Sequence, residues 1–174
     1  MIAVGILLNE IIADCSDGVR IMNGVGVLFF TTGLLAACIM DRKEQMVYRF
    51  LWLWSGLGAV LLMAVRIMDV GVPVGLLVEL GLFMVIQQVG FARFYGRADC
   101  HAYCVCAVAM AALGLNLQDY VIHMLITFVI LAAVQLIKRN VEAGGRLKKP
   151  VALIPYITVA LWLWVDFRCG KWYI

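Results

Sequence analysis

Two aspartates stand at the ends of hydrophobic segments, where a carboxyl group is costly. Asp41 follows the apolar run 21–40, and Asp99 opens an apolar segment that holds no further acidic residue before Asp119. An ionisable residue at membrane depth is by default a candidate for function. When two carboxyls approach each other, one keeps its proton and can act as an acid, while the other stays ionised and can activate water. Such a pair would perform aspartic-protease chemistry without a metal or an organic cofactor.

Each aspartate also has an ordinary structural interpretation. Asp41 is followed by Arg42, Lys43 and Glu44, so it fits a solvated charge cluster. Asp99 fits the first turn of a helix, where carboxylates are favoured. The functional interpretation therefore depends on whether the surrounding segments bring the two aspartates to the same side of the molecule.

The composition predicts an integral membrane protein. Of the 174 residues, 65% are apolar and 14% are charged, and the mean hydropathy is +1.00. Soluble domains are about 45–50% apolar and about 25% charged, so a soluble enzyme, a disordered protein and a nucleic-acid-binding domain are excluded as first interpretations. The net charge of +3 is too small to suggest a polyanionic partner.

Charge clusters divide the chain into segments that predict an all-α bundle of about six membrane-spanning helices. Each segment is close to the ~20 residues that a bilayer requires. Residues 1–13 form a further apolar segment, short for a span, and the sequence leaves open whether it crosses. We expect residues 1–174 to form one polytopic membrane domain, without the alternation typical of a barrel. The predicted spans are 21–40, 47–65, 73–92, 99–115, 119–137 and 151–165.

Lys and Arg residues in the loops predict the orientation of the bundle. Alternate loops form one set with ten basic residues and another with four, and the richer set is expected in the cytoplasm. Its longest member is a predicted loop at about residues 138–150. Asp41 and Asp99 belong to this side, because two spans separate them. We therefore expect a multi-pass protein of the cytoplasmic membrane whose aspartates face the cytoplasm.

The surroundings of both aspartates resemble motifs of the type IV prepilin peptidase family. Residues 94–101 (FYGRADCH) resemble its second-aspartate motif, G-x-G-D with a basic residue two positions later. Residues 41–49 (DRKEQMVYR) resemble its first-aspartate segment, in which an Ile-Pro-Asn-like tripeptide opens the next helix. The resemblance covers about residues 21–165. The residues that stand at the positions of the second motif are Gly96, Arg97, Ala98, Asp99 and His101.

This sequence departs from the family pattern at four positions. Ala98 stands where the family has glycine, and His101 replaces the usual lysine. Tyr48 and Arg49 replace the proline and asparagine of the tripeptide. Alanine is tolerable at position 98 if the backbone there does not need a positive φ.

The resemblance implies a short aspartic endopeptidase that removes the leader peptide of type IV (Flp-like) prepilins. The paired C-x-x-C motifs of long family members are missing, which implies cleavage without methylation. A prepilin would place its apolar helix in the bilayer and its basic leader in the cytoplasm. Asp41 and Asp99 would then hold a water molecule at the scissile bond. The sequence leaves the particular prepilin and the oligomeric state open.

Two other functions fit the sequence. A small transporter or a substrate-binding membrane subunit would need polar residues from several helices near the bilayer midplane. A membrane cysteine peptidase would use His101 and Cys104, which lie three residues apart on one predicted helix. These two residues and Cys100 do not complete a zinc site, which needs four ligands, and no metal is expected.

Other polar and small residues receive structural interpretations. Gln87 and Gln88 are expected to form hydrogen bonds between helices, and His123 is expected at the outer membrane interface. Several glycines allow close helix approach, either by a substrate helix or by ordinary packing. They lie in the stretch 56–60 and at Gly75 and Gly81.

Overall fold

The computed structural model describes residues 17–141 and 151–169, and within these ranges it contains helices and no strand. The prediction of an all-α fold is thereby confirmed, whereas the apolar segment 1–13 lies outside the described residues. The elements α4, η1 and α5 follow one another without a break, and η1 is a π-helical stretch. The helices are α2 (Asp17–Glu44), α3 (Arg49–Asp69), α4 (Val74–Val85), η1 (Ile86–Phe91), α5 (Ala92–Tyr95), α6 (Arg97–Ala112), α7 (Leu117–Val141) and α8 (Ile154–Cys169).

Four of the described helical segments are long and apolar enough to cross a bilayer. They confirm a multi-pass membrane protein in this coarser form, whereas a count of six crossings stays a prediction. The helices α6 and α8 have 16 residues each, which gives about 24 Å, less than the ~30 Å of a hydrocarbon core. The four segments are Gly18–Glu44, Arg49–Asp69, Val74–Tyr95 and Leu117–Ile137.

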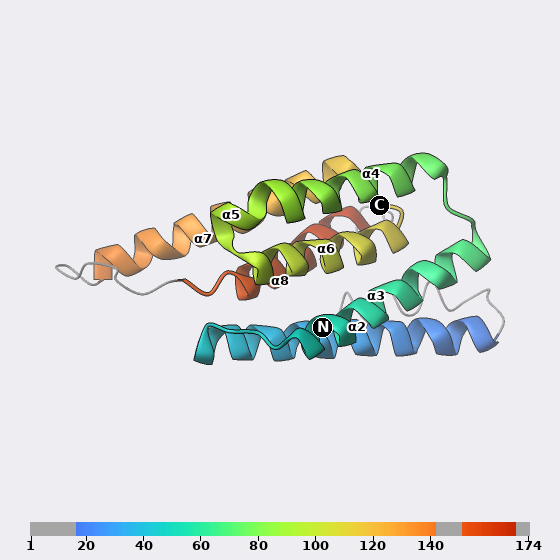
Figure 1. Ribbon diagram of the computed structural model, residues 1–174, viewed down its shortest axis with the longest axis horizontal. Coiled ribbons are helices and arrows are strands. Elements are labelled where there is room, and N and C mark those ends of the chain that lie inside the picture. The colour runs from blue at the N-terminus through green and yellow to red at the C-terminus, as the bar shows by residue number, and fades with distance from the viewer. Residues whose placement is uncertain (1–16, 142–150, 170–174) are drawn as a thin grey trace.

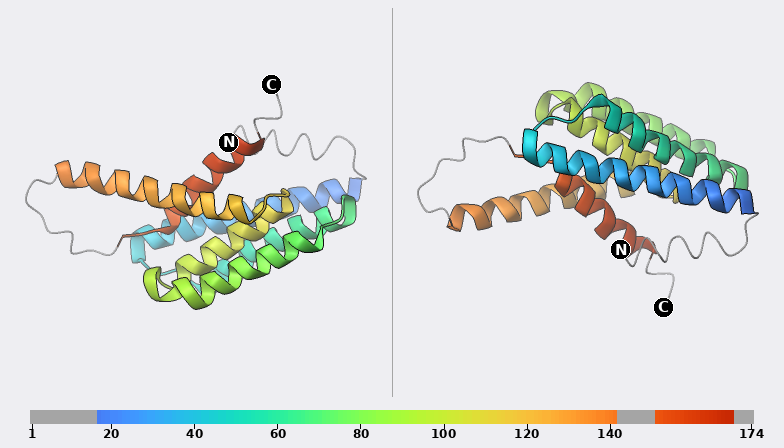
Figure 2. Two further views of the ribbon diagram at one scale, coloured as in Figure 1. Left: turned by 90° about the horizontal axis from the view of Figure 1, so that it is seen from above. Right: turned by 90° about the horizontal axis from the view of Figure 1, so that it is seen from below.

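Successive helices run in alternate directions along the long axis of the bundle (Figure 1). As a result, the turn between α2 and α3, the junction of α5 and α6, and the start of α8 lie at one end, the left end in Figure 1. We call this the aspartate end. Helix α3 packs between α2 and α6, and α8 crosses α7 obliquely (Figure 2).

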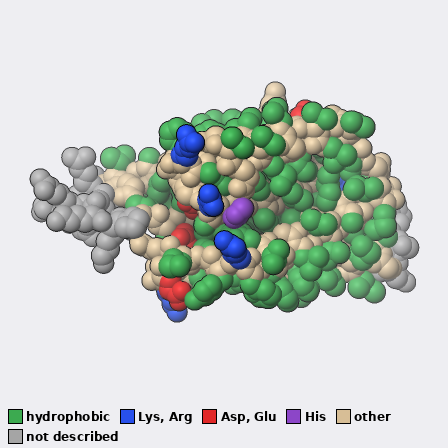
Figure 3. All heavy atoms as spheres, viewed as in Figure 1, with side chains coloured by type: hydrophobic (Ala, Val, Ile, Leu, Met, Phe, Trp, Pro, Cys, Tyr) green, Lys and Arg blue, Asp and Glu red, His purple; other side chains and the backbone are tan. Residues whose placement is uncertain are grey.

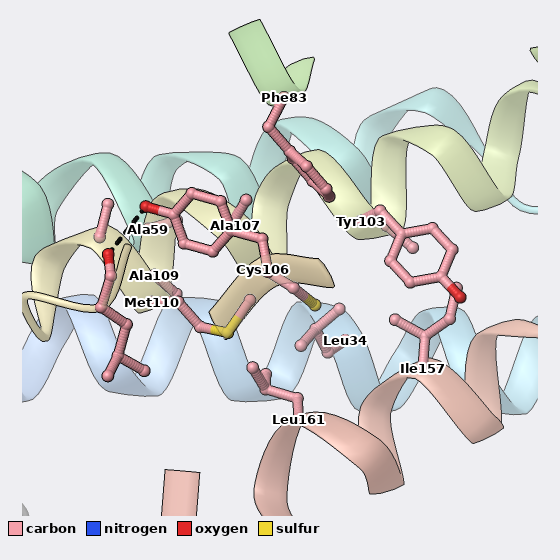
Figure 4. Packing of buried hydrophobic residues seen from close by; sticks show 14 of the residues in the cluster. Leu34, Ala59, Phe83, Tyr103, Cys106, Ala107, Ala109, Met110, Ile157 and Leu161 are labelled. Carbon is pink, nitrogen blue, oxygen red and sulfur yellow. Dashed lines mark hydrogen bonds between the residues drawn. The ribbon is translucent and has the colours of Figure 1, made fainter. Parts of the chain in front are cut away.

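The short helix α6 lies at the centre of the bundle. Its side chains meet residues of α2, α3 and α8 in one buried cluster, in which Tyr103, Cys106 and Met110 are fully buried (Figure 4). Alanine and cysteine make up much of its surface, and such small side chains let neighbouring helices approach closely. Because neighbouring helices surround α6, most of its side chains contact protein rather than lipid.

Glycines separate into two groups according to what surrounds them. A Cβ on Gly58 of α3 would collide with the backbone nitrogen of Phe30 on α2, and one on Gly33 would come within 2.7 Å of the Cβ of Ser55. A Cβ on Gly75 or Gly81 of α4 would meet nothing within 4 Å. The α2–α3 contact thus uses glycine for ordinary packing, while the glycines of α4 are open.

The prediction of a loop at about residues 138–150 is wrong at its start. Helix α7 continues to Val141, so residues 138–141 are helical, and residues 142–150 lie outside the described part. The sequence there contains no glycine or proline before Gly144, and Lys138 and Arg139 are favourable near a helix C-terminus.

The prediction of an interfacial His123 is also wrong. Its side chain is fully buried, and its Nε2 donates to the carbonyl oxygen of Ile157 on α8 at 2.9 Å. The oblique crossing of α8 over α7 covers this position. By contrast, the interhelical role of Gln87 is confirmed, since its Nε2 donates to the sulfur of Met124 on α7 at 2.9 Å.

Candidate functional site

Asp41 lies in the last turn of α2, at the aspartate end, with only 8% of its surface exposed. The backbone N–H of Ile154, the first residue of α8, donates to its Oδ2 at 3.1 Å. The first N–H groups of a helix lack partners within the helix, and a carboxylate there is favoured by the helix dipole. Asp41 therefore has a structural role, because it caps α8 across the bundle.

Asp99 lies in the first turn of α6, at the same end, and is half-buried. Gly96 precedes this helix with φ +88°, and a Cβ there would lie 3.7 Å from Asp99 Oδ2. The chain thus turns sharply beside the carboxylate at a residue that needs glycine. Ala98 is inside the helix, so its departure from the family's glycine brings no backbone strain.

The two carboxyls are close enough for the charge of Asp41 to act on Asp99. Burial, with the negative charge of Asp41 second, raises the pKa of Asp99 to about 7. Asp99 belongs to the first turn of α6, outside the four candidate spans. Near neutral pH Asp99 can therefore hold a proton beside Asp41.

The segment between α2 and α3 keeps a proline-like backbone without proline. Helix α2 ends at Glu44, and Gln45 follows with φ +53°. Tyr48, which stands in the place of the family's proline, has φ −67° directly before α3. Proline is fixed near −65°, so the backbone required at this position is adopted by tyrosine.

The remaining predicted site residues lie on the rim of the aspartate end. Arg97 is exposed. His101 is also exposed, its Nδ1 lies 3.0 Å from Gln88 Nε2 of η1, and its ring lies 6.4 Å from the ring of Trp52 on α3. His101 thus contacts η1 and α3 and lies two residues along α6 from Asp99.

A pairing of His101 with Cys104 is not what the structure contains. Gln88 Nε2 reaches both residues, at 3.0 Å from His101 Nδ1 and 3.5 Å from Cys104 Sγ. The amide of Gln88 therefore lies where a cysteine peptidase would need direct contact between thiol and imidazole.

Charged side chains gather at the aspartate end of the visible face, while apolar side chains cover most of the rest (Figure 3). The exposed basic residues of this end come from α2, α3, α5 and α6, the helices that also meet at the two aspartates' end of the bundle. This distribution fits a bundle end at a membrane–water boundary. The residues are Arg42, Lys43, Arg49, Arg93 and Arg97.

Two contributors to this end are not evident from sequence patterns. The N–H of Ile154 donates to Asp41 from far along the chain. No local sequence motif identifies a helix start that is capped by a residue of another helix. The π-helical turn at η1 places Gln87 inward and Gln88 toward α6. The signal that the sequence offered was the pair of adjacent glutamines within an apolar segment. π-Helical turns often occur at functional sites.

Replacing Gly96 with alanine is expected to reduce any activity of the aspartate pair about tenfold or more and to lower the melting temperature slightly. A residue with a Cβ is strained at φ +88°, at a cost of about 1–3 kcal/mol, and relaxation would shift Asp99. Activity and thermal unfolding in detergent measure the two effects. Ala98→Gly is the matched control, and equal losses in both variants would contradict a special role for Gly96.

The structure brings the carboxyls of Asp41 and Asp99 to one bundle end, where the charge of Asp41 acts on Asp99. No family model, curated protein or solved structure matches the chain.

Proposed function

We propose that this chain is an aspartic endopeptidase at the cytoplasmic face of the membrane that removes the leader peptide of type IV (Flp-like) prepilins. The observation that carries the proposal is the approach of Asp41 and Asp99. They come from α2 and α6, share one bundle end, and interact through their charges. Their sequence surroundings resemble the two aspartate motifs of that family.

The contacts of the two carboxyls favour different roles for them. Asp41 accepts the N–H of Ile154 through one carboxyl oxygen, and it would act as the general base. The raised pKa of Asp99, about 7, favours the protonated form that a general acid needs. Asp41 would take a proton from water as its oxygen attacks the scissile carbonyl carbon. Asp99 would protonate the carbonyl oxygen, which gives a gem-diol. As the C–N bond breaks, the proton on Asp41 would pass to the leaving amine, and a gem-diol hydroxyl would return a proton to Asp99.

The proposal includes the finer topology expected from the sequence. In it, the part of α6 after Asp99 and helix α8 cross the membrane together with the four longer segments. The aspartate end faces the cytoplasm, in agreement with the basic residues that surround it. A prepilin would lay its apolar helix against the bundle, so that its leader junction reaches Asp41 and Asp99.

Co-expression with a type IV prepilin tests the proposal directly. Loss of the leader shortens the pilin, so a gel-mobility shift that requires this chain is the expected result. The new N-terminus, read by mass spectrometry, identifies the bond that is cut. If Flp-like prepilins expressed at comparable levels all keep their leaders in the presence of the folded chain, the proposal is wrong.

Cleavage is expected to fall as the pH rises through about 7, because Asp99, with its pKa raised to about 7, then loses the proton that it must donate. The raised pKa also means that the folded chain binds this proton more tightly than the unfolded chain does. The stability that this proton contributes therefore falls as the pH rises from about 4 to about 7 and levels off above that. Initial rates in proteoliposomes at pH values from about 5 to about 9 measure the first effect. A rate that is constant up to about pH 9 would contradict Asp99 as the acid.

One observation favours a second candidate, the small transporter. Polar side chains from η1, α6 and α7 meet in the buried interior of the bundle, as midplane binding by several helices requires. Transport would depend on these buried residues and tolerate loss of the aspartate carboxyls, which cleavage would not. The residues are Gln87, Tyr103, His123 and Thr127, each fully buried.

A further inference from the structure

The residue that precedes the Gly96 turn is bonded to the π-helical stretch η1. The hydroxyl of Tyr95, the last residue of α5, donates to Oε1 of Gln87 at 2.5 Å. Gln87 is fully buried, and its Nε2 donates to the sulfur of Met124 on α7 at 2.9 Å. Both ends of this amide are therefore occupied, and they connect the end of α5 to the neighbouring helix α7.

The π-helical turn explains why these two residues, eight positions apart, can meet. In a continuous α-helix each residue turns the chain by about 100°, so Gln87 and Tyr95 would lie about 80° apart around the axis. A π-turn takes more residues per turn, and most of η1 lies between the two residues. The π-turn therefore reduces this angle and brings both side chains toward the same face, where the hydrogen bond forms.

Aromatic side chains from three neighbouring elements hold the ring of Tyr95. It stacks on Phe91 of η1 with centroids 5.5 Å apart, and it meets Tyr103 of α6 edge to face at 5.7 Å. The ring of Phe128 on α7 lies 6.1 Å away. Aromatic pairs prefer such stacked and edge-to-face arrangements, so these contacts and the bond to Gln87 together hold Tyr95 in one orientation.

The glycine between α5 and α6 makes an anchor at this place necessary. Gly96 has φ +88°, and Figure 1 shows the chain reversing its direction there. Glycine adopts positive and negative φ with similar ease, so the turn alone does not determine where α6 begins. Asp99 follows in the first turn of α6, and its carboxyl is close enough for its charge to act on the Tyr95 hydroxyl. A fixed Tyr95 therefore limits where Asp99 can lie.

We propose that Tyr95 positions Asp99 for the proposed reaction through its bond to Gln87. The bond fixes the turn at Gly96 and thereby holds the Asp99 carboxyl beside Asp41. No proton transfer is required of Tyr95, since the hydrogen of its hydroxyl is engaged by Gln87. The kinetic consequence rests on the proposed peptidase function, whereas the position of Asp99 can be measured without it.

Carbon NMR of the full chain, labelled at its aspartate carboxyl carbons, tests the positioning without any substrate. The signal that is lost in Asp99→Asn identifies Asp99, which should titrate at about pH 7 in the wild type. In Tyr95→Phe the start of α6 is released, so the carboxyl moves away from the charge of Asp41 and toward water. The midpoint should then fall by about one pH unit, which is tenfold in proton affinity. A midpoint that is unchanged or higher overturns the proposal.

Tyr120→Phe is the matched control for the loss of one tyrosine hydrogen bond. The Tyr120 hydroxyl donates to the carbonyl oxygen of Leu115 at 3.0 Å, in the turn between α6 and α7 at the opposite end of the bundle. This variant should leave the Asp99 midpoint unchanged, and an equal fall in both variants would overturn the specific role of Tyr95. Should Tyr95→Phe fail to fold, Gln87→Met removes the acceptor of the same bond and replaces it in the measurement.

Leader cleavage measures the kinetic consequence. Tyr95→Phe should lower kcat about tenfold with little change in KM, and the fall in rate at alkaline pH should begin at a lower pH than in the wild type. Combining it with Gln87→Met should lower kcat no further, because both changes remove the same bond. An unchanged kcat beside an active wild type overturns the positioning role. A wild-type chain that cleaves no prepilin contradicts the peptidase function instead, and the Asp99 midpoint still decides whether Tyr95 positions this carboxyl.

Discussion

Replacing either Asp41 or Asp99 with asparagine is expected to reduce leader cleavage by about 10²–10⁴-fold or more, because each change removes one half of the acid–base pair. Asparagine is the informative substitution at position 41, since its amide oxygen can still accept the N–H of Ile154 that the carboxylate accepts at 3.1 Å. The fold is thereby kept while the base is lost. Gel-shift assays and thermal unfolding of the purified variants measure the two properties separately.

Two substitutions serve as controls for this prediction. Asp166→Asn changes an exposed aspartate in the last part of α8, away from the aspartate end, and should leave cleavage unchanged. Cys104→Ser should also leave cleavage intact, because Gln88 rather than the thiol contacts His101 Nδ1. Processing that continues in both aspartate variants would eliminate the aspartic mechanism, and loss in Cys104→Ser alone would favour the cysteine alternative.

A comparison with Asp41→Ala separates the two roles of Asp41. Alanine removes both the base and the acceptor for the Ile154 N–H, and a buried donor left unpaired costs about 1–3 kcal/mol. We therefore expect Asp41→Ala to melt at a lower temperature than Asp41→Asn, with equal loss of cleavage. Equal melting temperatures in the two variants would show that the cap on α8 contributes little to stability.

The largest effect on stability is expected from Gly58→Ala, which should lower the melting temperature strongly or prevent folding. The added Cβ would collide with the Phe30 backbone nitrogen and lie 2.7 Å from the carbonyl oxygen of Gly26. Both contacts are backbone, so relief requires α2 and α3 to separate. Overpacking of this kind costs about 1–3 kcal/mol or more. Thermal unfolding and size-exclusion profiles in detergent measure the loss.

Gly81→Ala is the matched control for the effect of adding one methyl group to a helical glycine. A Cβ at Gly81 meets nothing within 4 Å, and alanine is favoured over glycine in a helix by about 1 kcal/mol. The control should therefore keep or slightly raise the melting temperature. Similar destabilisation of both variants would mean that helix packing at Gly58 is looser than the structure indicates.

The sequence by itself determined the all-helical class, the membrane setting and the shared end of the two aspartates. Hydropathy separates apolar segments from charged turns because the bilayer admits few charges. Helices in lipid satisfy their own backbone hydrogen bonds, so each apolar segment is expected to cross as a helix. After two such helices the chain is back at the end where it started. The shared end of Asp41 and Asp99 follows from that alternation.

Only the tertiary structure decided which residues face one another inside the bundle. The cap of Asp41 on α8, the burial of His123 and the contrast between Gly58 and Gly81 all depend on how helices pack. In a membrane protein, lipid-facing and helix-facing surfaces are both apolar, because lipid tails are as apolar as leucine. The hydrophobic pattern that identifies the core of a soluble protein therefore gives little information about which side chains face one another in this bundle. Packing and hydrogen bonds alone determine those neighbours.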